Sequence, residues 1–361
     1  MIMMTSVLFL FGLGLLIVGA ECLVKGASRL AAGVGISPLV VGLTVVAFGT
    51  SAPELVVSVH AAASGQADIA LGNVVGSNIC NVLLILGLAA LISPLSVSQQ
   101  LIRLDVPLLI GVSLLVFGLA LDGRVGRLDG LLLLSGIIAY TVFAVIKSRR
   151  ENRIVTAEYT AQFAVEVTPE NASDRYQTSK NAGLIILGLA LLVLGARWLV
   201  DGALAGARWL GISELIIGLT IVAVGTSLPE IATSVLASLR GQRDIAVGNV
   251  IGSNLFNLLG VLGMSSLISS NGVAVAPSAL HFDLPVMFAV AVACLPILFT
   301  GHRIERWEGG LFLAYYIFYL LYLGLAASGH VLLTSYTAAL LWFVLPLTAV
   351  TLLVSVWRTR S

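Results

Sequence analysis

The sequence predicts an all-α polytopic membrane protein, built from two inverted five-helix repeats and one extra C-terminal transmembrane helix. Apolar stretches of about 20 residues recur along the chain, the second half repeats the first, and basic residues concentrate in alternate breaks. Hydrophobic residues make up 58% of the 361 residues and charged residues only 10%, with a mean hydropathy of +1.05. A soluble core cannot bury that much apolar surface, so we expect a lipid bilayer around the protein.

The apolar stretches predict eleven membrane spans, each long enough to cross the hydrocarbon core. With the N-terminus outside and the C-terminus inside, 15 of the 19 basic residues fall on the cytoplasmic side, as the positive-inside rule requires. The predicted spans begin near Val7, Pro38, Ala70, Val106, Leu128, Ala182, Leu215, Ile245, Leu284, Gly309 and Leu332.

The repeat appears when the sequence is shifted by 176 positions, which brings Glu54 onto Glu230 and Asn81 onto Asn257 without a gap. Between positions 42 and 81, 25 of 40 residues are identical to their counterparts. Five predicted spans per copy is an odd number, so the second copy must enter the membrane from the opposite side. The predicted domains are residues 1–146 (first repeat), 147–180 (cytoplasmic linker), 181–327 (second repeat) and 328–361 (accessory transmembrane helix). Because the first span has a counterpart in the second copy, we interpret it as a structural element and not as a signal peptide.

Several other features have a structural interpretation. Cys22, Cys80 and Cys294 lie in apolar spans without metal-ligand or disulfide spacing, which is typical of small core residues. Asp105 and Asp283 each stand two residues before a proline, which predicts a helix N-cap. Asp68 and Asp244 follow short turns, where capping also accounts for them, so they are left outside the site. The net charge of +1 gives no reason to expect a nucleic-acid partner.

The candidate site lies in the most strongly repeated segments, G-L-T-V-V-A-F-G-T-S-A-P-E at 42–54 and G-L-T-I-V-A-V-G-T-S-L-P-E at 218–230. Each places an acid in an otherwise apolar span, where an acidic side chain costs about 2.5 to 3.5 kcal/mol on insertion scales. Two such acids without basic neighbours require a compensating partner. A cation fits that role.

The proline before each acid removes a backbone donor and predicts a kink in the helix. Carbonyl oxygens freed by the kink and nearby hydroxyl groups would then face the interior of the bundle. The oxygens expected here belong to Ala47, Thr50, Ser51, Ala223, Thr226 and Ser227. Oxygen ligands with two carboxylates suit hard cations such as Ca2+ and Na+, and do not suit Zn2+ or copper.

A second repeated pair, G-N-V-V-G-S-N-I-C-N at 72–81 and G-N-V-I-G-S-N-L-F-N at 248–257, predicts neutral oxygen ligands. Ser77 and Asn81 are four residues apart and share one helix face, as do Ser253 and Asn257. The alternative is interhelical hydrogen bonding. For the glycines of this motif, close helix packing is the favoured interpretation.

These doubled motifs resemble the alpha repeats of the calcium/cation antiporter superfamily, especially the prokaryotic sodium/calcium exchangers, over nearly the first ten predicted spans. The resemblance implies that Glu54 and Glu230 are the central Ca2+ and Na+ ligands. It assigns the supporting hydroxyl and carbonyl roles to Ala47, Thr50, Ser51, Ser77, Ala223, Thr226, Ser227 and Ser253. Some relatives carry Asp where this sequence has Asn81 or Asn257. With two carboxylates only, potassium dependence is less expected.

The sequence therefore predicts an antiporter that exchanges Ca2+ for Na+ by alternating access, in a prokaryotic inner membrane, with no cofactor and no obligate protein partner. A proton-coupled divalent-cation antiporter is the nearest alternative. A passive cation channel is a less favoured one. An intramembrane enzyme is disfavoured because the spans contain no Ser/His, paired-Asp or H-E-x-x-H arrangement.

Overall fold

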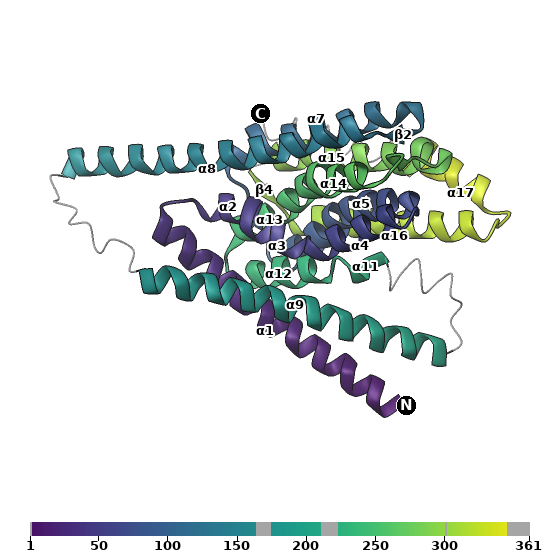
Figure 1. Cartoon of the computed structure of the whole chain (residues 1–361), viewed down its shortest axis with the longest axis horizontal. Coiled ribbons are helices and arrows are strands. Elements are labelled where there is room, and N and C mark those ends of the chain that lie inside the picture. The colour runs from purple at the N-terminus through teal and green to yellow at the C-terminus, as the bar shows by residue number, and fades with distance from the viewer. Residues whose placement is uncertain (1, 164–174, 211–222, 300–301, 345–361) are drawn as a thin grey trace.

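The computed structural model describes residues 2–163, 175–210, 223–299 and 302–344. Long helices lie side by side along the longest axis of the molecule (Figure 1). Seven of the described helices are long and apolar enough to cross a membrane, or eight if the bent pair Pro38–Thr50 and Ala52–Ala63 forms one span. The prediction of a helical polytopic membrane protein is confirmed. The count of eleven spans stays a prediction, because the spans expected from Leu215 and Leu332 lie partly outside the described residues.

The helices of the first half recur in the same order in the second half, except that the counterpart of the second helix lies outside the described residues and the last described helix has no equivalent in the first half. The first half forms α1 (Ile2–Val34), α2 (Pro38–Val41), α3 (Ala47–Thr50), α4 (Ala52–Ala63), α5 (Ala67–Cys80), α6 (Gly87–Ile92), α7 (Val106–Leu119) and α8 (Arg127–Phe163). The second half forms α9 (Arg175–Trp209), α11 (Ala223–Gly225), α12 (Leu228–Leu239), α13 (Arg243–Leu255), α14 (Leu262–Ile268), α15 (Leu284–Phe299), α16 (Arg306–Ala327) and α17 (Leu333–Ala339). Wider π-helical turns at Gly42–Val46, Asn81–Leu86, Leu101–Asp105, Phe256–Val261, Ala279–Asp283 and Leu340–Val344 connect or extend several of these helices.

Helices α1 and α9, which are sequence equivalents, pack against each other in opposite directions (Figure 1). A methyl group added at Gly12 would lie 2.8 Å from the carbonyl oxygen of Gly195, and one added at Gly19 would lie 2.9 Å from that of Gly188. Residues nearer the C-terminus of α1 therefore contact residues nearer the N-terminus of α9, so the two helices are antiparallel. Because the sequence shift pairs Gly12 with Gly188 and Gly19 with Gly195, the two copies meet through the same surface in inverted orientation.

Two short antiparallel ribbons also join the halves. Strand β1 (Leu95–Ser96) pairs with β4 (Arg303–Ile304), and β2 (Arg124–Val125) pairs with β3 (Val273–Ala274). Each ribbon contains one strand from each half. The strands β1 and β3 occupy equivalent places in the two halves, as do β2 and β4, so the two ribbons are equivalent to each other.

A further pair of equivalent contacts, one in each half, involves an aspartate and a tyrosine. Tyr140 donates a hydrogen bond of 3.1 Å to Asp105, and Tyr319 donates one of 3.0 Å to Asp283. Asp105 stands at the predicted N-cap position of α7, with Pro107 in the first turn, but its side chain makes no capping hydrogen bond. The N-cap of α13 is Gln242, and Asp244 lies in the first turn of that helix instead.

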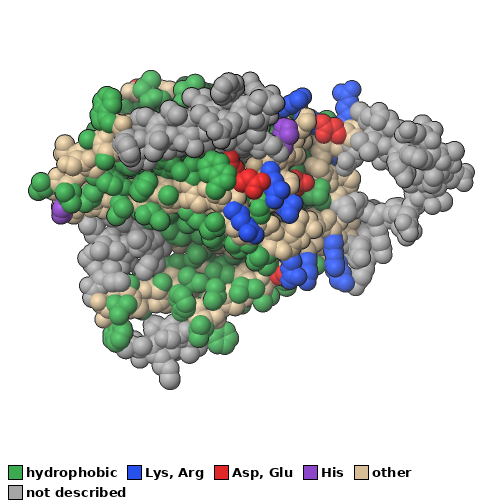
Figure 2. Space-filling view, turned by 180° about the vertical axis from the view of Figure 1, so that it is seen from behind, with side chains coloured by type: hydrophobic (Ala, Val, Ile, Leu, Met, Phe, Trp, Pro, Cys, Tyr) green, Lys and Arg blue, Asp and Glu red, His purple; other side chains and the backbone are tan. Residues whose placement is uncertain are grey.

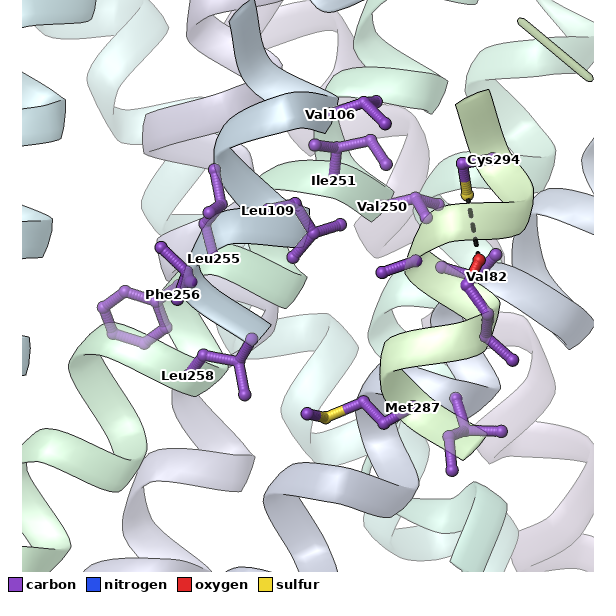
Figure 3. Close-up of a cluster of buried hydrophobic side chains, with 14 of the residues drawn as sticks. Val82, Val106, Leu109, Val250, Ile251, Leu255, Phe256, Leu258, Met287 and Cys294 are labelled. Atoms are coloured by element: carbon purple, nitrogen blue, oxygen red, sulfur yellow. Dashed lines mark hydrogen bonds between the residues drawn. The ribbon is translucent and has the colours of Figure 1, made fainter. Parts of the chain in front are cut away.

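The core lies around the helices that carry the second repeated motif. The apolar window of the span Arg243–Ile268 is 100% buried, and that of Ile69–Ile92 is 72% buried, whereas the windows in α1, α8 and α16 are only 33%, 22% and 11% buried. Figure 3 shows part of this core, where Leu255 and Phe256 lie near Leu109 of α7 and Met287 of α15 is close by. Cys80 and Cys294 are buried as predicted, and Cys22 is half-buried.

Much of the outer surface is apolar, and Lys and Arg side chains gather at one end of the molecule (Figure 2). That end carries the extensions of α8 and α9 beyond the bundle (Figure 1). Helix α8 continues to Phe163 and α9 begins at Arg175, so much of the predicted linker 147–180 is helical. The apolar side surface and the charged end fit a protein that crosses a bilayer.

Candidate functional site

The helix that carries Glu54 is bent where the sequence predicts a kink. The segments Pro38–Thr50 and Ala52–Ala63 meet at 47°, and Ser51 at the break has φ −83° and ψ 8°. Pro53 lies in the first turn of α4 and lacks the N–H that would continue the hydrogen-bond ladder. In the second half, Ser227 before α12 has nearly the same backbone angles, φ −87° and ψ 7°. Each acid therefore follows a break by one helical turn.

One expectation about the kink is not met. The carbonyl oxygen of Ala47 is not freed, because it accepts the backbone N–H of Ser51 at 3.0 Å. Ala223 begins α11, and its side chain lies outside the described part of the chain. Cation ligation by these two carbonyl groups stays a prediction.

The two carboxylates are buried at the centre of the molecule and are held by the opposite half. Glu54 is 1% exposed and Glu230 is 0% exposed. Ser51 donates a hydrogen bond of 2.9 Å to Oε1 of Glu230, and Ser227 donates one of 3.2 Å to Oε1 of Glu54. The second oxygen of each carboxylate, Oε2, is buried and has no hydrogen-bond partner. One buried oxygen of each carboxyl group thus lacks any described partner in the protein.

The threonines next to the serines contact asparagines of the opposite half. Thr50 donates to Oδ1 of Asn249 at 3.0 Å, and Thr226 is 3.5 Å from Oδ1 of Asn73. The same asparagines donate to the backbone carbonyl groups of the acids, from Asn249 to Glu230 at 3.4 Å and from Asn73 to Glu54 at 3.3 Å. Because the threonine hydrogens are used in these bonds, the remaining hydroxyl lone pairs can face a cation.

The sequence interpretation did not select Asn73 and Asn249, although both stand in the second repeated motif. Each also donates to a serine one turn beyond the acid, from Asn73 to Ser58 and from Asn249 to Ser234, both at 2.9 Å. Duplication at the same shift of 176 positions was the available signal for all four residues. They position the helix segments that carry the acids.

The second motif supplies further oxygens at the same place. Ser77 lies 3.5 Å from Ser227, and the hydroxyl of Ser253 is buried without a partner. Asn81 and Asn257 are buried, and Oδ1 of each amide has no hydrogen-bond partner. Gly248 and Gly252 lie against the backbone of Gly42 and Leu43, as close packing requires, whereas a methyl group at Gly72 or Gly76 would meet no described atom within 4 Å.

The site offers oxygen atoms that could bind a cation, and no described basic side chain pairs with its two carboxylates. Among the residues that the structure describes, no Lys, Arg or His forms a salt bridge with Glu54 or Glu230, and no group of three or more His, Cys, Asp or Glu side chains exists. A buried carboxylate without a counter-charge is strongly destabilising. The arrangement therefore fits one or more hard cations bound by two carboxylates, hydroxyl groups and amide oxygens.

Fold and site together define a helical membrane protein of transporter type, in which two inverted halves bring two buried carboxylates together. The family model of the sodium/calcium exchanger protein matches residues 4–146 and 180–325. The chain belongs to this sodium/calcium exchanger family.

Named relatives agree with this assignment. The chain is 41% identical over 321 residues to the putative antiporter CaxA of Alkalimonas amylolytica, covering 88% of this chain and 98% of that protein. It is 36% identical over 351 residues to the sodium/calcium exchanger MaX1 of Methanosarcina acetivorans, covering 90% and 99%. A solved structure of the sodium-calcium exchanger NCX_Mj superposes with a TM-score of 0.75 at 33% identity, covering 89% of this chain and 99% of the other. The chain is thus an integral membrane protein and a cation antiporter by family.

Proposed function

We propose that this protein exchanges Ca2+ for Na+ across a prokaryotic inner membrane, and that both ions bind in turn between Glu54 and Glu230. The observation that carries the proposal is the pair of fully buried carboxylates, each with one oxygen that lacks a partner. One Ca2+ would neutralise both charges. The surrounding hydroxyl and amide oxygens are ligands that Ca2+ and Na+ share.

Alternating access follows from the way in which the halves share the site. Each carboxylate accepts its hydrogen bond from a serine of the opposite half, from Ser227 to Glu54 and from Ser51 to Glu230. A movement of one helix group against the other would change both contacts together and expose the ligands to one side at a time. Ions that compete for these ligands would then be carried in opposite directions.

The direct test is 45Ca2+ uptake into proteoliposomes that contain the purified protein and are loaded with Na+. Uptake should follow the outward Na+ gradient and should stop when K+ replaces Na+ inside. Glu54→Gln and Glu230→Gln should each lose uptake. Asp201→Asn, on an exposed position of α9, is the matched control and should transport as the wild type does.

Other results would assign a different mechanism. Uptake that follows a pH gradient and ignores Na+ would indicate a proton-coupled divalent-cation antiporter. Uptake that needs no counter-ion gradient and continues at equal Na+ on both sides would indicate a passive channel. Either result would contradict sodium/calcium exchange, and in both cases the glutamate variants would still report whether this site carries the flux.

A further inference from the structure

Four buried asparagines meet between the two halves. Asn78 at the end of α5 and Asn81 in the following π-helical turn come from the first half. Asn254 at the end of α13 and Asn257 in the turn after it are their equivalents in the second half. All four are at most 2% exposed. Asn78 and Asn254 belong to no ligand set considered above.

The hydrogen bonds of these side chains cross between the halves. Asn81 donates through Nδ2 to Oδ1 of Asn254 at 2.9 Å. Asn257 donates through Nδ2 to Oδ1 of Asn78 at 3.4 Å. We call Asn81 and Asn257 the outer asparagines, and Asn78 and Asn254 the inner asparagines. Each outer asparagine thus uses its NH2 group for a contact with an inner asparagine of the opposite half.

The direction of these bonds is set by acceptors that cannot act as donors. Nδ2 of Asn254 donates to the backbone carbonyl of Asn78 at 3.4 Å, and a carbonyl oxygen only accepts. Nδ2 of Asn78 points to the thioether sulfur of Met287 at 3.7 Å, which also only accepts. The NH2 groups of the inner asparagines are therefore fixed, and their oxygens face Asn81 and Asn257.

The consequence for the outer asparagines is that their amide oxygens stay out of the network. Oδ1 of Asn81 and Oδ1 of Asn257 are buried and have no partner. Asn81 lies on the same helix face as Ser77, which is 3.5 Å from the serine that binds Glu54. The free oxygen of Asn81 thus belongs to a side chain on the helix face that carries Ser77, and Asn257 is its equivalent in the second half.

We propose that Asn78 and Asn254 are positioning residues, which hold the amides of Asn257 and Asn81 with the oxygen, and not the NH2 group, toward the bound cation. The inference rests on the proposed function, because it gives Asn81 and Asn257 the role of ligands. An amide can rotate to present either end. An NH2 group turned toward a cation repels it, so a site that uses asparagine ligands needs a device that fixes their orientation.

The test compares Ca2+ affinity in Asn254→Leu, Asn254→Asp and the wild type. Leucine has nearly the same shape and removes the acceptor for Asn81, so the KM for Ca2+ in Na+-driven uptake should rise about tenfold or more, with a smaller change in the maximal rate. Aspartate keeps an oxygen toward Asn81 and, when protonated, can still donate to the carbonyl of Asn78. Its KM should stay within about threefold of the wild type. Asn181→Leu, a buried asparagine of α9 outside the site, is the control.

A double-mutant cycle separates positioning from a general structural effect. Once Asn81→Leu has removed the oriented amide, adding Asn254→Leu should raise the KM no further. Additive effects, or a KM that Asn254→Leu leaves unchanged, would overturn the proposal. If Asn254→Leu does not fold, Asn78→Leu paired with Asn257→Leu gives the same cycle in the other half.

The Ca2+-induced rise in unfolding temperature serves as a second readout that needs no transport. If the wild type fails to exchange Ca2+ for Na+, the proposed function is wrong. If the wild type exchanges the ions but Ca2+ affinity does not depend on Asn254 or Asn78, only the positioning role is wrong.

Discussion

The sequence places two acidic side chains, Glu54 and Glu230, in the interior of the protein. The fold provides a hydrogen-bond partner for only one of the two oxygens of each. One oxygen of each carboxylate accepts a serine hydrogen bond, and the other has no partner. Without a cation, the two acids repel each other and are poorly solvated. The stability of the protein should therefore depend on what occupies this space.

The first prediction concerns the charge itself. Glu54→Gln removes one buried carboxylate, so the cation-free protein should unfold at a higher temperature than the cation-free wild type. At the same time, the stabilisation by saturating Ca2+, about 2.7 kcal/mol at 100 times the Kd, should be lost. Thermal unfolding in detergent with chelator and with Ca2+ measures both effects. A variant that is less stable without Ca2+ and still responds to it would contradict the cation role of Glu54.

The second prediction concerns the asparagines that hold the acids. Asn249→Leu removes the bonds to Thr50, Ser234 and the carbonyl of Glu230, and should destabilise the protein by about 1–3 kcal/mol. Asn73→Leu should behave similarly, because its bonds are equivalent. Unfolding temperatures beside Asn181→Leu provide the comparison. An Asn249→Leu protein as stable as the wild type would exclude this supporting role.

At this scale, the sequence predicted the groups that carry charge or a hydroxyl near the acids. The acid, the threonine and the serine lie within five residues of one another in each repeated motif, so the motif itself identifies them as candidates. Their contacts are not local, because Ser51 binds Glu230 and Ser227 binds Glu54. Asn249 reaches Glu230 across 19 positions and Thr50 across 199. Such contacts depend on how α12, α13 and α3 pack, which no local pattern contains.

At the scale of elements, the close contact between α1 and α9 depends on glycines. A methyl group at Gly188 would lie 2.6 Å from the backbone nitrogen of Leu23 and 2.7 Å from the carbonyl oxygen of Gly19. Backbone atoms cannot move aside as a flexible side chain can. The helices would have to separate.

The third prediction follows from that contact. Gly188→Ala should destabilise the protein by about 1–3 kcal/mol because it overpacks the α1–α9 interface. Gly183→Ala, on the same helix but with no atom within 4 Å of the added carbon, should be neutral or slightly stabilising, because alanine favours a helix more than glycine does. Equal effects of the two substitutions on the unfolding temperature would show that the interface tolerates the extra methyl group.

Prolines and apolar stretches in the sequence predict some of the structural elements and miss others. The kink before Glu54 was predicted because Pro53 has a local steric effect. The two ribbons were not, since each strand has only two residues and is too short for an alternating pattern. Asp105 was expected to cap α7, but its acceptor role toward Tyr140 depends on the packing of α8, 35 residues away.

For the whole molecule, the contacts described above make each half incomplete alone. Neither half holds both carboxylates, and each carboxylate takes its hydrogen bond from the other half. The ribbons β1–β4 and β2–β3 join the same two halves. The inverted arrangement could be predicted from sequence because the repeat is strong and each copy holds an odd number of predicted spans. Which individual residues pair between the two halves could not be predicted from sequence.

The fourth prediction uses this mutual dependence. If the chain is cut between Phe163 and Arg175, the two pieces expressed together should copurify and should show the Ca2+-induced rise in unfolding temperature. Either piece alone should not. A cut after Leu133, inside α8 and at a fully buried residue, is the control that should prevent assembly. A single piece that binds Ca2+ would contradict a site shared by both halves.

The lack of a described basic side chain beside the carboxylates has a consequence for leakage. If the protein works as proposed, the empty site carries two negative charges, and a change of sides without cargo would move them through the membrane potential at about 2.3 kcal/mol per charge and 100 mV. Closing the site around bare carboxylates also removes them from water. Bound Ca2+ cancels both penalties, so the unloaded carrier should rarely return alone, and tight coupling between the two ion flows would need no separate gate.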